Sequence, residues 1–317
     1  MSAVPTLILL GDSEHGVARY ANQIADAIDN GGCPVSATGP AHAHFTDRMW
    51  GSSPEDAAEH FERVAAQQPT SVTLHDLPQH SDGTINLPRR IACYARVVAA
   101  AHGVVCNSAH EALLLAEFVD ASITPTVIPL PVDVQAQPDS ATPVDGSVAL
   151  VGFFYPGKGH RDAVDAVTLL HPPLSDVVAL GKASPGHERD LANLERHAET
   201  VGVRFSATGF LSDAELIARC RRAGVPLAAH QHVSASGSLG TWISAGRRPL
   251  VPNTRYSREM SELRPGTVTL YEPGELGAAI AYALENPRST WWGSEASTGP
   301  STQQVTEQYI QFWAGLL

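Results

Sequence analysis

The stretch VALVGFFYPGKGHRDAVDAV, residues 148–167, carries the pattern that decides the fold. A short apolar run over 148–152 predicts a strand, and a turn bounded by glycines leads from it into the opening of a helix. Lys158 in this turn can direct its ammonium group at a diphosphate, and the helix N-terminus adds to the same positive field. The pattern G-x-x-x-x-G-K-[ST] is absent, so the turn is no P-loop, and a solvated lysine is the alternative interpretation.

Strand and helix patterns alternate along nearly the whole chain, which is typical of βαβ units and of parallel sheets buried on both faces. The predicted strands cover 7–10, 71–74, 103–106, 126–128, 148–152, 177–180, 203–207, 225–228, 249–251 and 267–271. Predicted helices of the first half cover 18–28, 54–67 and 109–118, and residues 39–50 are not assigned. The sequence therefore predicts doubly wound α/β sheets, whose ligands bind outside the carboxyl ends of the strands.

Length and linker composition predict two domains. A chain of 317 residues is long enough for two domains of roughly 150 residues each. The polar run VQAQPDSATPVDG at 134–146 separates the two series of strands. We therefore predict one Rossmann-like domain over 1–140 and a second over 146–300. Ser212 and Glu215 form a capping box at the start of a helix, and residues 303–317 predict a last amphipathic helix whose Tyr309, Phe312 and Trp313 need a surface to cover.

Charge and cysteine content exclude several classes of protein. A net charge of -12 leaves no basic footprint for a phosphate backbone, which argues against a nucleic-acid partner. The four cysteines show no C-x-x-C spacing, which argues against a zinc site and a disulfide framework. No run approaches the ~20 apolar residues of a membrane span, and the apolar run at 4–10 predicts a strand and not a signal peptide. We expect a cytoplasmic protein with at most peripheral membrane contact.

Two segments of the first half place polar residues where strands end. In GDSEHGVARYANQIADAI, residues 11–28, Glu14 and His15 precede a helix that begins near Gly16, where a ligand can approach the backbone. In SVTLHDLP, residues 71–78, His75 and Asp76 follow an apolar strand directly, so His75 can bond a sugar hydroxyl or the reacting group. A single glycine is a weak signal, and a histidine satisfied by nearby backbone is the alternative. Four other histidines are assigned to structural or surface positions: His80, His102, His110 and His230.

The segment HQHVSASGSLGTWISAGRRPLVPN, residues 230–253, places small polar residues before an apolar helix. The hydroxyl and N–H groups of Ser236, Gly237 and Ser238 converge at the helix start and would form a cradle for a diphosphate. An N-capped buried helix is the alternative, and both interpretations can hold together. Arg247 and Arg248 lie at the far end of this helix, where they complement its C-terminus, so they are not counted as phosphate ligands.

Taken in order, these segments resemble the retaining glycosyltransferases of family 4, over nearly the full chain. The matching pieces are HGVARYANQIADAI, TLHD, VVCNSAHEALLL, VIPLPVD, VALVGFFYPGKGH, FSATGFLSDAEL and the SGSL and SAGRRPLV block. The resemblance implies a GT-B fold, in which two Rossmann-like domains face a cleft, and a last helix that packs back on the N-terminal domain. It also implies a nucleotide-diphosphate sugar as donor, either a UDP- or a GDP-hexose, and no obligatory metal or other cofactor.

The resemblance also implies roles for individual residues. Lys158 and His75 would be the catalytic groups, and Glu14, His15, Gly16 and Asp76 would lie on the side of the acceptor, which can be a glycan, a lipid or a small metabolite. The donor phosphate and sugar would contact Gly159, Ser236, Gly237, Ser238 and Leu239, and the position of Lys182, not the resemblance, adds it to this set. The nucleoside would lie beside Gly209, Phe210 and Glu259.

The chain departs from the family pattern at three positions. Family members usually carry an arginine about five residues before the lysine, where this chain has the run FFY at 153–155. They also carry two glutamates eight residues apart, and Val233 and Thr241 stand there. A lost phosphate arginine removes a charge-assisted hydrogen bond worth roughly 1.5–3 kcal/mol, which Lys182 or Arg161 could replace by position.

These departures leave two functions open. The first is a hexosyltransferase that acts with retention. The second is a non-catalytic GT-B homologue that serves as a nucleotide-binding, sugar-binding or partner subunit. A GT-B enzyme outside sugar transfer, such as an epimerase, has no specific support.

Overall fold

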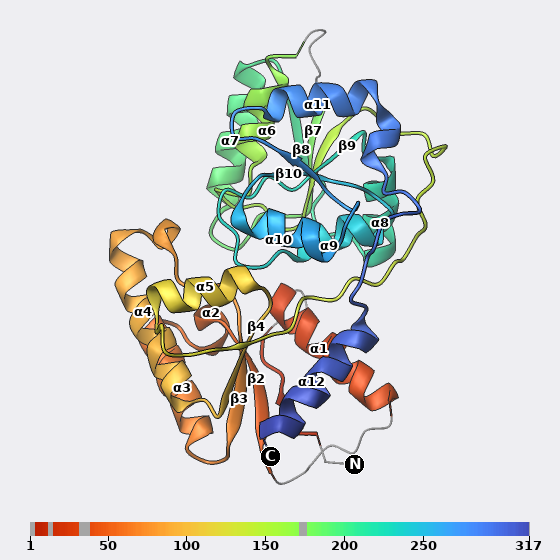
Figure 1. Cartoon of the computed structure of the whole chain (residues 1–317). Coiled ribbons are helices and arrows are strands. Elements are labelled where there is room, and N and C mark those ends of the chain that lie inside the picture. Colours follow the sequence, from red (N-terminus) through yellow and green to blue (C-terminus); the bar gives the residue numbers. More distant parts are fainter. Residues whose placement is uncertain (1–3, 12–14, 32–38, 171–175, 317) are drawn as a thin grey trace. The chain divides into compact units, whose positions relative to one another are not determined.

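The computed structural model of the chain describes residues 4–11, 15–31, 39–170 and 176–316 (Figure 1). The chain forms two compact units. Unit 1 comprises Met1–Pro131 and Pro300–Leu317, and unit 2 comprises Val132–Gly299. Unit 2 is therefore inserted into the sequence of unit 1. Within the described part of the chain, no helix has the length and apolar character that a membrane crossing needs.

Unit 1 is built on a parallel sheet of five strands in the order β1-β2-β3-β4-β5. The strands are β1 (Thr6–Ile8), β2 (Ala41–Phe45), β3 (Thr70–Leu74), β4 (Gly103–Cys106) and β5 (Thr126–Val127). The helices are α1 (Gly16–Asn30), α2 (Asp47–Trp50), α3 (Pro54–Ala65), α4 (Gly83–Ala100), α5 (Ala109–Phe118) and α12 (Thr302–Leu316).

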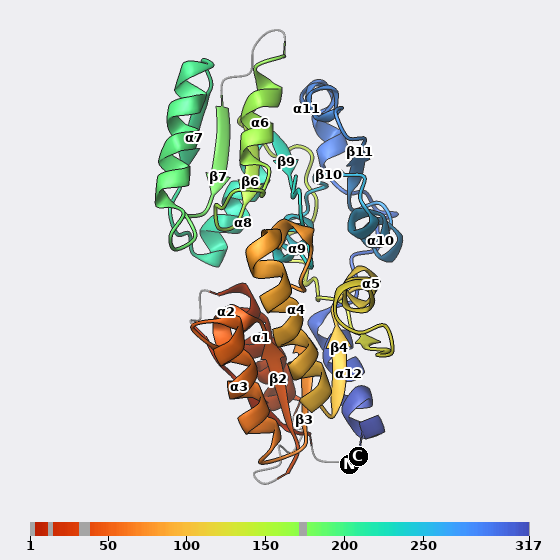
Figure 2. The same cartoon turned by 90° about the vertical axis from the view of Figure 1, so that its left-hand side faces the viewer.

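Helices cover both faces of this sheet (Figures 1 and 2). On one face, Phe45 of β2 packs with Phe61 of α3 and Tyr94 of α4 in a core of buried side chains. On the other face, α12 packs against α1, and Tyr309 and Trp313 are buried together with aliphatic residues of α1. The aromatic residues of the last helix therefore lie against unit 1.

Unit 2 is built on a parallel sheet of six strands in the order β11-β10-β9-β6-β7-β8. The strands are β6 (Val148–Val151), β7 (Asp176–Leu180), β8 (Arg204–Ala207), β9 (Val225–Leu227), β10 (Leu250–Pro252) and β11 (Thr269–Tyr271). The helices are α6 (His160–Val167), α7 (Glu188–Thr200), α8 (Asp213–Arg222), α9 (Gly237–Ser244), α10 (Arg255–Leu263) and α11 (Leu276–Glu285). Since the chain winds outward in both directions from the adjacent strands β6 and β9, the ends of these two strands form the topological switch point, where sheets of this kind bind ligands.

Arg247 helps to hold unit 2 together and is closed to ligands. Its guanidinium is fully buried and donates to carbonyl oxygens of Cys220, Ala223 and Gly224 at the end of α8. Burial lowers its pKa to about 10. The sequence predicted that Arg247 would complement the C-terminus of α9, the helix that precedes it. In the structure its guanidinium lies instead at the C-terminus of the neighbouring helix α8.

Candidate functional site

Two loops meet at the switch point of unit 2. Gly159 follows β6 with a φ of +91°, and a Cβ added to it would lie 2.3 Å from the carbonyl oxygen of Ala229, which follows β9. The amide of Gln231 donates to the carbonyl oxygen of Gly157 at 2.9 Å. Only glycine fits a left-handed position this close to another backbone, so the sequence GKG at 157–159 joins the loop after β6 to the loop after β9.

Lys158 lies in this joined region as a buried cation that has no counterion among the residues that the structure describes. Its side chain is 7% exposed, and Nζ lies 5.4 Å from the centroid of the Tyr155 ring. No carboxylate among the described residues pairs with the ammonium group, and burial lowers its pKa to about 8. A charge removed from water without a partner is costly, so this position favours an anion that arrives from outside.

His230 connects the lysine with the serine segment. Its Nε2 atom lies 3.3 Å from Oγ of Ser238. Burial and then the charge of Lys158 lower its pKa to about 3, so the ring is neutral. From the sequence, His230 was assigned to a structural or surface position. Its position in the site depends on which strands flank the switch point. Its place three residues after the end of β9 is the signal that could have distinguished it among the 14 histidines.

The serine segment forms the start of α9. Ser236 is the N-cap residue, and its Oγ accepts from the amide of Leu239 at 3.2 Å. The amide of Ser236 donates to the hydroxyl of Tyr256 at 3.0 Å. These two amides of the predicted cradle are therefore used within the protein. The amides of Gly237 and Ser238 have no partner among the described residues and remain available to an anion.

A small cavity adjoins this helix start. Its volume is about 10 Å³, enough for one water molecule. The residues that line it include His230, Val233, Ser236 and Tyr256. Glu259, the predicted ribose ligand, is partly buried and lies on α10, the helix that contributes Tyr256.

Lys182, Gly209 and Phe210 gather at the ends of the neighbouring strands. Nζ of Lys182 lies 5.7 Å from the ring centroid of Phe153 and 5.9 Å from that of Phe210. Phe210 is 58% exposed and follows Gly209, whose α-carbon faces open space. An exposed aromatic ring of this kind can stack on a nucleobase. Arg161, the other candidate for the missing cation, forms an exposed ion pair with Asp165 at 3.0 Å.

The chain has only two lysines, and both stand in this region. Lys158 follows β6 and Lys182 follows β7, and these two strands are paired neighbours in the sheet. The carboxyl ends of parallel neighbours meet at one edge, so both ammonium groups belong to one side of unit 2.

In unit 1, His75 and Asp76 follow β3. The amide of His75 donates to the carbonyl oxygen of Phe45 at 2.9 Å, and its Nε2 lies 3.0 Å from Nδ1 of His44. The His75 side chain is 5% exposed, and burial lowers its pKa. Asp76 has a φ of 48°, a left-handed conformation that costs free energy for a residue with a side chain.

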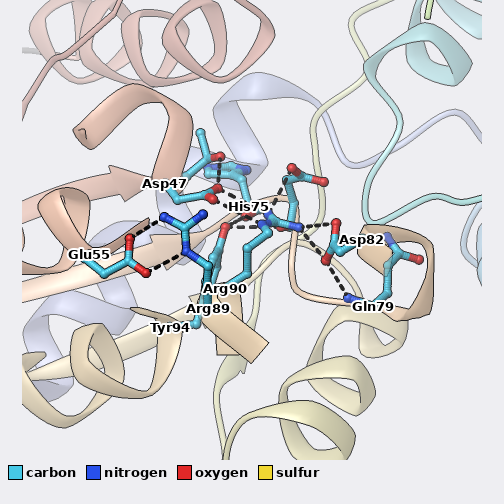
Figure 3. Close-up of polar contacts among 10 residues, drawn as sticks. Asp47, Glu55, His75, Gln79, Asp82, Arg89, Arg90 and Tyr94 are labelled. Carbon is cyan, nitrogen blue, oxygen red and sulfur yellow. Dashed lines mark hydrogen bonds and ion pairs between the residues drawn. The ribbon is translucent and has the colours of Figure 1, made fainter. Parts of the chain in front are cut away.

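Arg90 of α4 holds this turn in place (Figure 3). Its guanidinium forms ion pairs with Asp47 and Asp76 at 3.1 Å each and with Asp82 at 2.7 Å. It also donates to the backbone carbonyl of Asp76, while the hydroxyl of Tyr94 donates to the carbonyl oxygen of His75 at 2.5 Å. Arg90 was not predicted from the sequence, because its partners come from three separate segments.

The other predicted residues of unit 1 lie at the start of α1. His15 is the N-cap residue, and its Nδ1 accepts from the amide of Val17 at 3.3 Å. A Cβ added at Gly16 would meet no atom within 4 Å, so the backbone is accessible there. Glu14 lies outside the described residues. Within the described ranges, no group of three metal-ligating side chains is placed to hold an ion.

Comparison with known proteins identifies the fold. No protein-family model and no curated protein sequence matches the chain. Among solved structures, Anabaena Alr3699/HepE in complex with UDP-glucose is similar over 99% of this chain and 97% of its own, with a TM-score of 0.66 and 16% identity. The sucrose-phosphate synthase of Thermosynechococcus elongatus is similar over 95% of this chain and 75% of its own, with a TM-score of 0.63 and 15% identity.

A third similar structure is a UDP-forming α,α-trehalose-phosphate synthase from Burkholderia xenovorans. It matches over 93% of this chain and 74% of its own, with a TM-score of 0.58 and 11% identity. These neighbours and the two parallel sheets define the GT-B fold, and the prediction of this fold is confirmed.

Proposed function

We propose that this chain is a glycosyltransferase that moves a hexose from a nucleotide-diphosphate sugar to an acceptor hydroxyl. The observation that carries the proposal is the buried ammonium group of Lys158, which has no counterion among the described residues and stands at the switch point of unit 2. A diphosphate of a donor sugar supplies the missing negative charge. The GT-B fold of the chain supports the proposal, as does its similarity to a protein crystallised with UDP-glucose.

The proposed chemistry uses the protein to stabilise a leaving group. As the bond between the sugar and the diphosphate breaks, negative charge develops on the phosphate oxygen that leaves. Lys158 neutralises part of this charge, and the open amides of Gly237 and Ser238 donate hydrogen bonds to the diphosphate. Lys182 would supply the second cation in place of the family arginine, and Phe210 would stack on the base. Retention of stereochemistry is the outcome that the family resemblance favours.

His75 is the proposed contact to the transferred sugar. It stands at the carboxyl end of β3, and Asp76 and Gly16 belong to the proposed acceptor side of the same unit. We propose a UDP-hexose as the first donor to test, because three of the similar structures are complexes with UDP, UDP and glucose, or UDP-glucose. The acceptor remains a glycan, a lipid or a small metabolite, and the protein is proposed to act in the cytoplasm without an obligatory metal.

A non-catalytic role is the second candidate. Val233 and Thr241 stand where family members carry glutamates, and the hydroxyl of Thr241 donates to the carbonyl oxygen of Gly237 at 3.1 Å inside α9. Neither position can supply a carboxylate. A protein with this site would bind a nucleotide sugar without turning it over.

The two functions separate in a paired measurement. Calorimetric titration with UDP, GDP and their hexoses measures binding, and release of free UDP or GDP measures turnover. Binding with turnover supports the transferase, and binding without turnover supports the subunit. If the folded protein binds none of these nucleotides, both proposals are wrong.

A matched pair of variants tests the residue that carries the proposal. Lys158→Met removes the buried ammonium and keeps an unbranched side chain, so affinity for UDP should fall by about 10- to 150-fold, the value of one charge-assisted hydrogen bond. Arg161→Met removes an exposed cation three residues away and should leave the affinity unchanged.

A further inference from the structure

A ladder of buried polar side chains crosses one face of the sheet of unit 1. His42 and His44 come from β2, Ser71 and Thr73 come from β3, and His75 follows β3 directly. All five side chains are at most 5% exposed. Water does not reach the fully buried atoms of these groups, so the protons on those atoms need hydrogen-bond partners within the protein.

The hydrogen bonds around His42 have one consistent order. Oγ of Ser71 donates to the carbonyl oxygen of Ala41 at 3.3 Å, so it accepts from Nδ1 of His42 at 2.8 Å. Nε2 of His42 then carries no proton and accepts from the hydroxyl of Thr73 at 3.0 Å. The oxygen of Thr73 in turn accepts from the hydroxyl of Tyr309 at 2.8 Å. Burial lowers the pKa of His42 and keeps its ring neutral, and the hydrogen bonds place the single proton on Nδ1.

His44 and His75 share one proton. Nδ1 of His44 lies 3.0 Å from Nε2 of His75, so one of these two atoms donates and the other accepts. The remaining nitrogen of His44, Nε2, is buried and has no hydrogen-bond partner within the described part of the chain. If His75 donated, neutral His44 would carry its proton on Nε2, and an N–H group would be orphaned in the core. Buried N–H groups without a partner are rarer than acceptors that lack one, so the arrangement in which His44 donates is favoured.

We propose that His44 is a positioning residue that holds His75 in the tautomer with its proton on Nδ1. His75 therefore offers a ligand an N–H donor, and no free nitrogen on which to accept a proton. This role for His75 toward a sugar rests on the proposed function, whereas the tautomer itself rests on the hydrogen bonds of unit 1 alone. The ring of Tyr20 packs against the rings of both His44 and His75, at interplanar angles of 85° and 84°, and so helps to hold the two imidazoles in place.

The tautomer can be measured directly. Long-range proton–nitrogen NMR spectra of the full ¹⁵N-labelled chain distinguish protonated from bare ring nitrogens, and the signals of His75 are assigned by their loss in His75→Asn. We expect a protonated Nδ1 and a bare Nε2 for His75. A proton on Nε2, or two tautomers in exchange, would overturn the proposal.

Two substitutions of His44 test the cause of this tautomer. His44→Asn places an amide N–H where Nδ1 stood, and His44→Phe keeps a ring of similar size without a donor. We expect the Asn variant to retain the wild-type pattern of His75 and the Phe variant to lose it. If the Phe variant folds and keeps the pattern, His44 does not cause the tautomer. If the Phe variant does not fold, the proposal is tested on the wild-type and Asn spectra, and a proton on Nε2 of His75 in either one would contradict it.

Turnover separates this inference from the proposed function. With UDP-hexose, His44→Phe should lower kcat/KM by about tenfold, since one oriented hydrogen bond is lost, while the affinity for UDP stays unchanged. An unchanged kcat/KM in a variant with an altered tautomer would contradict the positioning role. If the wild-type protein shows no turnover at all, the proposed function fails, and the NMR result on the tautomer still stands.

Discussion

At the scale of single residues, the proposed chemistry of unit 2 depends on Lys158, a cation that is buried away from water. Lys158 is buried against the ring of Tyr155, and burial alone lowers its pKa to about 8. An ammonium group in this state is close to losing its proton under ordinary conditions. An anion that binds beside it restores the charged form and raises the pKa.

The first prediction concerns pH. Lys158 is protonated below pH 8 and loses its charge as the pH rises through that value, while a diphosphate stays fully ionised above pH 7. The affinity for UDP should therefore fall between pH 7 and pH 9. Calorimetric titration at several pH values checks this, with Lys158→Met as the control that should show a flat profile. A wild-type affinity that is constant over this range would contradict the assignment of Lys158 to the diphosphate.

At the scale of elements, helix starts decide whether a serine is structural or functional. Ser236 caps α9 in the candidate site, where its hydroxyl accepts from the amide of Leu239, three residues later. Ser53 caps α3 in unit 1 in the same way, since its hydroxyl accepts from the amide of Asp56. The two caps have the same chemistry, and only one of them adjoins the open amides of Gly237 and Ser238.

The second prediction follows from this comparison. Ser236→Ala and Ser53→Ala should each lower the free energy of unfolding by about 0.5–2 kcal/mol, the value of an N-cap. Only Ser236→Ala should also weaken the binding of UDP, because the start of α9 loses its order beside the ligand. Chemical denaturation and calorimetry measure the two effects. Equal affinities in the two variants would indicate that the serine segment is a helix cap and nothing more.

The third prediction concerns the attachment of α12. The hydroxyl of Tyr309 bonds Thr73 at 2.8 Å and the hydroxyl of Tyr20 at 3.1 Å, so it joins α12 to both β3 and α1. Tyr309→Phe leaves these buried partners unsatisfied and should destabilise the protein by about 1–3 kcal/mol. Tyr282→Phe, at a position that is 60% exposed, is the control and should have little effect. Urea unfolding monitored by tryptophan fluorescence compares them, and equal stabilities would show that the bond to α12 contributes nothing.

Local signals were sufficient to predict many of these elements. Strand β4 and helix α5 have the bounds expected from the sequence, and Ser212 and Glu215 form the predicted capping box of α8. Such features depend on residues at most a few positions apart, which a single sequence shows directly.

Elements and contacts set by distant segments escaped prediction. Strand β2 has the sequence AHAHF and was not assigned, because its two histidines look like exposed polar residues until their partners are known: the hydroxyls of β3 for His42 and the ring of His75 for His44. Arg90 was missed because one of its partners, Asp47, is 43 residues away in the sequence. His230 was missed because its place beside Lys158 depends on the pairing of β6 with β9. The candidate site was predictable where a loop follows its own strand, as at Lys158, and hidden where two loops combine.

At the scale of the whole molecule, buried neutral histidines occur in both units. His44 of unit 1 and His160 and His230 of unit 2 each have a pKa lowered to about 3, with burial as the main cause. His160 is the extreme case, because both of its ring nitrogens are buried and neither has a hydrogen-bond partner among the described residues; the rings of Phe154 and Phe205 pack against it. In the unfolded chain these imidazole rings are exposed to water and bind protons at pH values at which the same rings stay neutral in the folded protein.

The fourth prediction is a loss of stability in acid. An unfolded histidine titrates near pH 6.5, so between about pH 6.5 and pH 3 the unfolded state binds protons that the folded state refuses, and stability falls with the pH. His160→Phe removes one such ring and should make the midpoint of thermal unfolding less sensitive to pH, without loss at pH 7.5. His102→Phe replaces an exposed ring and should keep the wild-type slope. A pH dependence that is the same in all three proteins would refute this account.

The insertion of unit 2 between the two segments of unit 1 has a consequence for biosynthesis. Residues 132–299 are contiguous, so unit 2 can fold as soon as it leaves the ribosome. The apolar face of α1 has to wait, because Val305, Tyr309 and Trp313, which cover it, are translated only afterwards. Until then a nascent chain carries an uncovered hydrophobic surface near its beginning, the kind of surface that chaperones bind.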